Sequence, residues 1–306
     1  MSTYDFTFVI PSFNEGHYLQ ETVDSILETA GKSGVEVIAV DDHSDDYSGL
    51  ELSIAYRNDK RVDVISGDAR LGAGAARQLG AQRARGDTLV FLDAHSRMPE
   101  GWPELLKAAI ARSGKKVLYG TALYPLTENG FDAGASEAHG VWLDTPDLNE
   151  HYCPVRENTV NPYPVMAIPG GSIVIDRAFF GELGGFDPGI MPPWGQEVLE
   201  LSMRTWAMGY EVRIIPTVRI STLYKPPSQA NPGIKTEYLL YNRLRIALLY
   251  LGRDRAEKVL NELRMHDWFD KAMGLMFCER YGSLLERSIE LQRHPEEVFE
   301  RFGLNW

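Results

Sequence analysis

Short apolar runs and helical patterns alternate along the N-terminal third of the chain. Four apolar runs have the length of buried strands: residues 6–10, 35–40, 62–65 and 88–92. Apolar side chains recur at helical spacing over residues 19–30, and an alanine-rich helix is predicted over about 75–84. Strands that alternate with helices imply right-handed crossovers and a mostly parallel sheet. The pattern therefore predicts an α/β fold with helices flanking such a sheet.

The rest of the chain is less regular. Residues 129–168 contain several prolines and scattered aromatic residues, which predict irregular structure. Four elements are then predicted in order: a strand at 172–175, a helix capped by Asp176, a helix at about 197–208 and a strand at 212–215. The sequence KPPSQANPGIK at 225–235 predicts a mobile loop.

The order of these elements divides the chain into two parts. We expect an α/β domain over residues 1–236, made of halves at 1–98 and 99–236, and a helical C-terminal extension over 237–306. At 306 residues, the length allows one large domain or two smaller ones, each able to bury a core. The composition, with 44% hydrophobic and 24% charged residues, is that of a globular protein and excludes wholesale disorder, collagen and coiled coils.

The charge and the cysteine content narrow the function classes. The chain carries 43 acidic and 31 basic residues, a formal charge of −12, which disfavours proteins that grip nucleic-acid backbones. No apolar run approaches the ~20 residues that span a bilayer. The N-terminus lacks a basic region, and its apolar stretch stops at Pro11, so no signal peptide is expected. With only Cys153 and Cys278, no disulfide framework is expected, and the cytoplasm is the expected location.

Polar residues stand where the predicted strands end. They are Asn14 and Glu15 after the first strand, Asp41 and Asp42 after the second, and Asp93 and His95 after the fourth. In sheets of this kind, ligands bind beyond the carboxyl ends of the strands. The sequence therefore predicts a polar ligand site at this edge of the sheet.

Asp93-Ala94-His95 is the most specific candidate in that set. Two residues apart on an extended segment, Asp93 and His95 point to the same side. A carboxylate oxygen and an imidazole nitrogen suit a divalent ion such as Mn²⁺, with substrate phosphate oxygens in other positions. The alternative is a strand-end aspartate that caps a turn and a histidine that faces solvent.

Four segments in a fixed order carry a family resemblance. They read VIPSFNE at 9–15, VDDHS at 40–44, ARQLG at 76–80 and GDTLVFLDAH at 86–95. This set resembles the nucleotide-binding half of family 2-like glycosyltransferases with the GT-A fold, which is Rossmann-like. The D-x-H form looks most like that of the polypeptide N-acetylgalactosaminyltransferases.

The second half of the chain carries further pieces of the same resemblance. They read GGS at 170–172, DRAFF at 176–180, GGFD at 184–187, WGQEVLELS at 194–202, RTW at 204–206 and YNRLRIA at 241–247. The resemblance spans roughly residues 6–250 and leaves the last segment of the chain unassigned.

The resemblance implies a metal-dependent glycosyltransferase that moves a sugar from a nucleotide-sugar donor, expected to be a UDP-sugar, to a hydroxyl acceptor. It implies a nucleotide site formed by Pro11, Ser12, Asn14, Glu15, Asp41, Asp42, Arg77 and Asp93. Arg77 would lie near the diphosphate or brace the site. Mn²⁺ or Mg²⁺ would bind Asp93 and His95, and the sugar would contact Gly170, Gly171 and Glu197. Glu197, Asp93 and Trp194 are the catalytic candidates, and the 225–235 loop would close over the donor.

Two positions depart from the family pattern. Thr222 stands where the relatives carry a third metal-ligand histidine, so the ion would lose a protein ligand or use another, for which His139 is a candidate. Val198 stands where inverting relatives carry a general-base aspartate. The resemblance therefore implies a retaining reaction, as in the polypeptide transferases. Glu197, Asp187 or His139 would be the base of an inverting one.

Other functions are also compatible with parts of the sequence. The segment LGAGAAR at 71–77 resembles the dinucleotide-binding fingerprint of a dehydrogenase. Arg77 replaces the third glycine, and the motif does not open the first strand–helix unit, so a dehydrogenase is disfavoured. A catalytically idle protein that binds a nucleotide sugar remains an alternative. The acceptor class stays open: a peptide, a saccharide, a small molecule or a hydroxylated nucleobase in DNA. Because no lectin module and no membrane anchor are expected, a bacterial or viral cytoplasmic enzyme is the working hypothesis.

Overall fold

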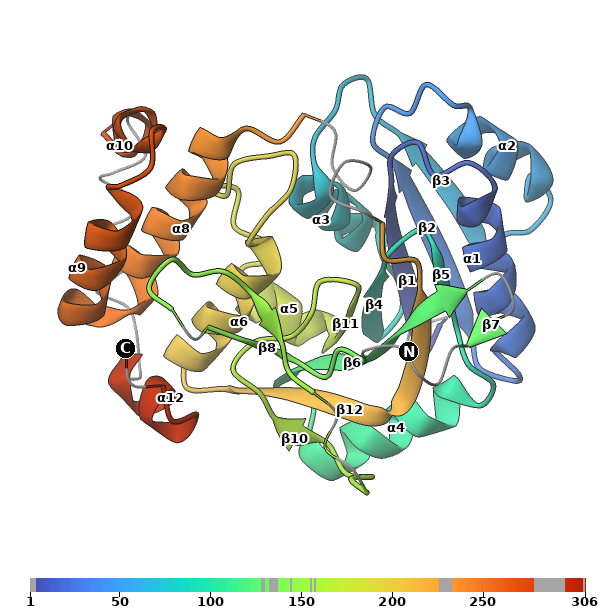
Figure 1. The fold of residues 1–306 in the computed structure, drawn as a ribbon. Helices are drawn as coiled ribbons and strands as arrows, with labels where there is room; N and C mark the ends of the chain where they lie inside the picture. The colour runs from blue at the N-terminus through green and yellow to red at the C-terminus, as the bar shows by residue number, and fades with distance from the viewer. Residues whose placement is uncertain are drawn as a thin grey trace.

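The computed structural model describes residues 4–127, 130–131, 137–143, 145–154, 156, 158–225, 233–277, 295–304 and 306. In these residues ten strands form one sheet, in the order β10-β12-β6-β11-β4-β1-β2-β3, with β5 beside β12 and β7 beside β6 (Figure 1). The strands are β1 (Phe6–Ser12), β2 (Val35–Asp41), β3 (Val62–Ser66), β4 (Thr88–Leu92), β5 (Ser96–Arg97), β6 (Val117–Thr127), β7 (Gly130–Phe131), β10 (Tyr163–Pro164), β11 (Ser172–Asp176) and β12 (Glu211–Thr222). The short strands β8 (Val141–Trp142) and β9 (His151–Tyr152) pair separately.

The direction of the strands decides which loops meet. Strands β4, β1, β2 and β3 are parallel, so their carboxyl ends share one edge of the sheet. Strand β11 runs antiparallel to β4, with Ser172 opposite Leu92, so the residues before β11 lie beside the residues after β4. This mixed, mostly parallel sheet confirms the predicted α/β architecture.

Helices cover both faces of the sheet. They are α1 (His17–Thr29), α2 (Ser48–Ala55), α3 (Ala73–Arg83), α4 (Trp102–Ser113), α5 (Arg177–Glu182), α6 (Glu197–Ala207), α8 (Thr236–Tyr250), α9 (Gly252–Leu263), α10 (Phe269–Met276) and α12 (Pro295–Arg301). Side chains alternate across β1: Phe8 joins an apolar cluster with α1, α2 and α4, and Val9 joins a cluster with α3, α5, α6 and the C-terminal helices. The alternation explains why continuous apolar runs form β1, β2 and β4, since both faces of these strands are buried, whereas β3 at the edge of the sheet is only partly buried.

The predicted strand at 212–215 is too short. Strand β12 runs from Glu211 to Thr222 and passes through Pro216. The pairing with β6 shifts its register between Ile215 and Arg219, and such an irregularity accommodates a proline that cannot donate to the ladder. The longer strand brings Thr222 to the edge of the sheet where β1 and β4 end.

The predicted C-terminal helices are present where the chain is described. Leu240, Leu244 and Ala247 of α8 are buried in the same apolar cluster as α6, whereas Leu248 on the same helix is exposed. In Figure 1, α8, α9 and α10 lie on the side of the molecule opposite α1 and α2. The division at residue 236 stays a prediction. Most of the 225–235 loop and Cys278 lie outside the described residues.

The length and apolar character of the described helices can be compared with those of a membrane-spanning helix. None of them combines the length and the apolar character that a bilayer crossing requires.

Candidate active site

A pocket of about 370 Å³ opens where β1, β2, β4 and β12 end. Most of the residues that the sequence singled out line it: Pro11, Ser12, Asn14, Glu15, Asp42, Arg77, Asp93, His95, Gly171, Trp194 and Thr222. Six of the residues singled out do not line it: Asp41, His139, Gly170, Asp187, Glu197 and Val198. The strand ends that the apolar pattern located thus converge on a single cavity.

Asp93 follows β4 and is held from two sides. Its Oδ1 accepts a hydrogen bond from Nη2 of Arg77 at 3.1 Å, and its backbone N–H donates to the carbonyl of Gly171 at 3.2 Å. A Cβ on Gly171 would lie 2.9 Å from Leu123 and 3.2 Å from Oδ2 of Asp93, whereas a Cβ on Gly170 would meet only Val198, at 3.8 Å. The approach of β11 to Asp93 therefore requires glycine at 171 but not at 170.

Arg77 connects three segments of the site. Its side chain is only 3% exposed, and it donates to Oε1 of Glu197 at 2.8 Å, to Asp93 and to the carbonyl of Gly170 at 3.1 Å. The other oxygen of Glu197 accepts from the backbone N–H of Gly195 at 3.0 Å. Glu197 borders a neighbouring cavity of about 340 Å³ instead of the pocket. Arg77 thus braces the pocket, with Glu197 ion-paired behind it.

His95 is paired with a carboxylate. Oε2 of Glu15 lies 3.0 Å from Nδ1 of His95 and 2.6 Å from Nζ of Lys225. Burial of Glu15 favours its neutral form, but the hydrogen bonds and charges of His95 and Lys225 outweigh burial and lower the pKa of this carboxyl group. Since an ionised carboxylate only accepts, Nδ1 of His95 donates this hydrogen bond, and Nε2 is the ring nitrogen left for another partner.

Thr222, which stands in place of the third metal-ligand histidine of the relatives, lies at the pocket but has no replacement ligand in His139. Thr222 lines the pocket, and the Oγ of Ser96 donates to its Oγ1 at 3.1 Å. The proposed substitute, His139, is buried away from the pocket with Nδ1 3.0 Å from the hydroxyl of Tyr163, and burial lowers its pKa. Within the described residues, no three His, Cys, Asp or Glu side chains gather as a metal site. Asp93 and His95, the two predicted ligands, both line the cavity.

The two aspartates after β2 have different surroundings. Asp42 lines the pocket and accepts from the backbone N–H groups of Leu71 and Gly72, which fixes the loop before α3. Burial raises the pKa of Asp42 in spite of these hydrogen bonds. Asp41 turns to the start of α2, where it accepts from the N–H of Ser44 at 3.0 Å and a Cβ on Gly49 would lie 2.4 Å from its Oδ2.

Several lining residues were not singled out from the sequence. They are Phe13, Arg70, Ala73, Ala94, Leu123, Tyr152, Pro193, Leu223, Tyr224 and Lys225. The rings of Tyr152 and Tyr224 meet edge to face at 6.2 Å, and with Trp194, which is 47% exposed, they form the aromatic rim of the pocket. Tyr152 comes from the irregular region, where nothing in the pattern marks it. Phe13 lies inside the motif at 9–15 and Arg70 directly precedes the segment at 71–77, so their neighbours were a usable signal.

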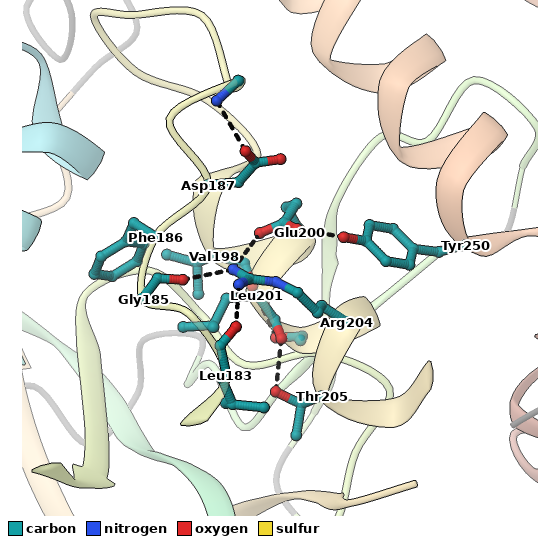
Figure 2. A network of polar contacts seen from close by, with 12 residues as sticks. Leu183, Gly185, Phe186, Asp187, Val198, Glu200, Leu201, Arg204, Thr205 and Tyr250 are labelled. Atoms are coloured by element: carbon teal, nitrogen blue, oxygen red, sulfur yellow. Dashed lines mark hydrogen bonds and ion pairs between the residues drawn. The ribbon is translucent and has the colours of Figure 1, made fainter. Parts of the chain in front are cut away.

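Other motif residues build a buried polar network. Figure 2 shows Arg204 donating to the carbonyls of Leu183 and Gly185 and to Glu200 at 2.8 Å, and Tyr250 donating to the same carboxylate. Asp187, a candidate base, is held by Arg245 at 2.8 Å. These groups fix α6 against the preceding loop and against α8, and neither Asp187 nor Glu200 lines the pocket.

Comparison with known proteins identifies the family. The model for glycosyl transferase family 2 matches residues 7–184, more than half of the chain. The chain belongs to glycosyl transferase family 2. The match ends before Trp194, Glu197 and Thr222, so it covers the strand-end motifs and β11 but not the later part of the site.

The similar proteins of this family carry related names. The chain is 35% identical to human polypeptide N-acetylgalactosaminyltransferase 15 over 76% of its own length and 38% of that protein. It is 32% identical to polypeptide N-acetylgalactosaminyltransferase 11 of Xenopus tropicalis over 86% of the chain and 46% of that protein. The chain thus spans less than half the length of these relatives.

A solved structure supports the same fold. A crystal structure of GalNAc-T7 with UDP, GalNAc and Mn²⁺ matches 98% of this chain and 57% of its own, with a TM-score of 0.78 at 23% identity. The predicted family and its GT-A-like fold are therefore confirmed.

Proposed function

We propose that this protein transfers a sugar from a UDP-sugar to a hydroxyl acceptor in a reaction that depends on a divalent cation. One observation carries the proposal: Asp93 and His95 face the same cavity as residues 11–15 and Asp42, at the carboxyl ends of the parallel strands. The names of the relatives support sugar transfer, and UDP and Mn²⁺ in the GalNAc-T7 structure support the donor and the ion.

The donor set at the strand ends fits a borderline divalent cation. Asp93 would supply a carboxylate oxygen and His95 a ring nitrogen, a mixture that suits Mn²⁺ and is also compatible with Mg²⁺. Such an ion, once bound, neutralises the charge of the departing diphosphate. Because two protein ligands leave coordination positions free, the phosphates of the donor would complete the set.

The surroundings of the candidate bases support retention. Val198 has no proton acceptor, Glu197 is paired with Arg77, and Asp187 is paired with Arg245. His139 is buried away from the cavity. With none of them lining the pocket, the acceptor proton would pass to a phosphate oxygen of the departing UDP, on the same face of the sugar.

The aromatic rim of Tyr152, Tyr224 and Trp194 would hold the acceptor and cover the donor sugar. The names of the relatives favour the hydroxyl groups of a peptide and a GalNAc donor. A saccharide, a small molecule and a hydroxylated nucleobase are the other acceptors to test. A cytoplasmic location also stays a prediction, which cell fractionation tests.

Asp93→Ala provides the direct test. Because Asp93 is the carboxylate of the proposed cation site and is part-exposed, the variant should fold normally and lose transfer by at least about a hundredfold. UDP release from UDP-GalNAc and UDP-GlcNAc is measured with Mn²⁺ and with EDTA, and NMR of the product gives its anomeric configuration. Full activity in Asp93→Ala would refute the assignment. Tight UDP binding without turnover of any donor would instead support a catalytically idle protein that binds a nucleotide sugar. Thr222 favours this alternative because it replaces a metal-ligand histidine of the relatives.

A further inference from the structure

One carboxylate oxygen of Glu15 accepts hydrogen bonds from two side chains. Its Oε2 accepts from Nδ1 of His95 at 3.0 Å and from Nζ of Lys225 at 2.6 Å. The three side chains are 10%, 15% and 18% exposed, so water screens the interactions only partly. Glu15 follows β1, His95 follows β4 and Lys225 follows β12, so the contact joins three strand ends.

The contact with His95 determines which nitrogen is left for a metal. Because the carboxylate of Glu15 accepts the hydrogen bond, it fixes Nδ1 as the donor and leaves Nε2 as the nitrogen available to a metal ion. A carboxylate behind a ligating imidazole fixes the ring orientation and raises its basicity. Removal of such a partner typically costs about 10–100-fold in metal affinity.

The contact with Lys225 adds a positive charge close to the same imidazole. The end of β12 offers the ammonium of Lys225 and the neutral hydroxyl of Thr222, which accepts from Ser96. An ammonium repels a divalent cation and attracts a diphosphate. The charge at this strand end therefore weakens binding of the cation alone and strengthens binding of the cation together with a nucleotide.

We propose that Glu15 is a positioning residue that orients His95 toward the divalent cation and holds Lys225 beside it, so that cation and nucleotide bind cooperatively. The proposal rests on the proposed function, because it takes the cation and the diphosphate of a UDP-sugar as the ligands. It assigns Glu15 to the support of His95 and Lys225 and not to contact with the nucleotide itself.

Mn²⁺ affinity measured without nucleotide tests the orienting role. We compare wild type, Glu15→Gln and Glu15→Leu by electron paramagnetic resonance, with Glu51→Gln on the exposed face of α2 as the matched control. Glu15→Leu should weaken Mn²⁺ binding about 10–100-fold. Glu15→Gln keeps an acceptor oxygen, so its Mn²⁺ affinity should fall less. ¹⁵N NMR of His95 should show the Nδ1–H form in wild type and a mixture of ring forms in Glu15→Leu.

Lys225→Met tests the charge effect, because the two ligands should respond in opposite directions. Without nucleotide, Mn²⁺ should bind more tightly to this variant than to wild type, since a like charge is gone. With saturating Mn²⁺, UDP should bind about tenfold more weakly, the equivalent of one lost charge contact of about 1.4 kcal/mol.

Three results would overturn the inference: equal Mn²⁺ affinity in wild type and Glu15→Leu, a shift of both affinities in the same direction in Lys225→Met, or no Mn²⁺ binding by the wild type. The proposed function fails separately. If Glu15→Leu loses Mn²⁺ affinity as expected while wild type transfers no sugar from any UDP-sugar, the positioning role holds and the transferase proposal does not.

Discussion

At the scale of single residues, the pocket is held in place by charges that already have partners. Arg77 neutralises Glu197 and contacts Asp93, and Glu15 contacts His95 and Lys225. Removing one member of a buried ion pair costs several kcal/mol, because it leaves the other charge unpaired. The side chains that would meet a donor are therefore fixed before it binds, which lowers the reorganisation that binding requires.

Gly170 and Gly171 are a matched pair, because only Gly171 lines the pocket and approaches Asp93. Gly171→Ala crowds Leu123 and Asp93 and should lower stability by about 1–3 kcal/mol. Gly170→Ala has room and should leave the melting temperature unchanged. Because Gly170 does not line the pocket, this variant should also keep the wild-type KM for the donor, and a KM raised about tenfold would instead place the donor sugar against Gly170. Thermal denaturation and steady-state kinetics measure both. Equal loss of stability in the two variants contradicts the argument.

Glu150 should make stability depend on pH. The residue is exposed, yet desolvation of its carboxyl group, with repulsion from Glu197, raises its pKa to about 7. A raised pKa in the folded state means that the protonated form stabilises the fold at low pH, and that this contribution is lost as the pH rises from about 4.5 through 7. Glu150→Gln should therefore raise the free energy of unfolding more at pH 8 than at pH 5, by less than about 1 kcal/mol because solvent screens the group, and thermal denaturation at the two pH values measures this difference. Equal shifts at both pH values would show that the carboxyl group is not perturbed.

The strand-end residues could be predicted from the sequence, but their partners could not. Alternating apolar runs locate the end of a strand to within a residue, which is why Asp42, Asp93 and His95 were found. Glu15 was assigned to the nucleotide, whereas its observed contacts are with His95, 80 positions away, and Lys225, 210 positions away. No local pattern encodes which loops meet at such separations, because the order of strands in the sheet decides it.

At the scale of elements, the antiparallel strand β11 completes the site. It lies between the parallel strands and β6, and its start delivers Gly171 beside Asp93. The sequence predicted this strand but not its direction or its place, because single strands carry no signal for their neighbours. It also left β6, α2 and α4 without an assignment. Strand β12 was predicted too short because Pro216 normally ends a central strand, and here a shift of register accommodates it.

The cap of α5 allows a test of stability that leaves the pocket untouched. The side chain of Asp176 accepts from the N–H groups of Ala178 and Phe179 at 3.0 and 3.1 Å. Asp176→Ala should cost about 1 kcal/mol and lower the melting temperature by roughly 2–4 °C. Asp176→Asn keeps an accepting oxygen and serves as the control, with stability near that of wild type. Both variants should transfer sugar at the wild-type rate, and a loss of stability in the asparagine variant equal to that in alanine would contradict the capping role.

At the scale of the whole molecule, the pocket is attached to both layers of the core. Neighbouring residues of β1 enter opposite apolar clusters, and the loop that follows β1 forms one wall of the cavity. The molecule has a formal charge of −12, but in this pocket the basic side chains of Arg70, Arg77 and Lys225 balance the carboxyl groups of Glu15, Asp42 and Asp93. Such a balanced set in an acidic protein suits a phosphate-bearing ligand held together with a cation, without the broad positive field that binds nucleic acids.

Because ligands would bind at strand ends shared by both clusters, binding should stabilise the fold as a unit. With Mn²⁺ present throughout, UDP at about a hundred times its Kd should add about 2.7 kcal/mol and raise the melting temperature by roughly 5–10 °C. UDP with EDTA should give a smaller shift, since the diphosphate then lacks the cation. Differential scanning fluorimetry measures all these combinations on one sample.

Asp93→Ala is the control for this shift, because it removes the carboxylate proposed to hold the cation but leaves Arg77 paired with Glu197. In this variant, Mn²⁺ should add nothing to the effect of UDP. Glu51→Gln, on the exposed face of α2, should respond as wild type does. If Mn²⁺ raises the melting temperature of Asp93→Ala with UDP as much as that of wild type, then the cation binds elsewhere, and the two-ligand site at the end of β4 is wrong.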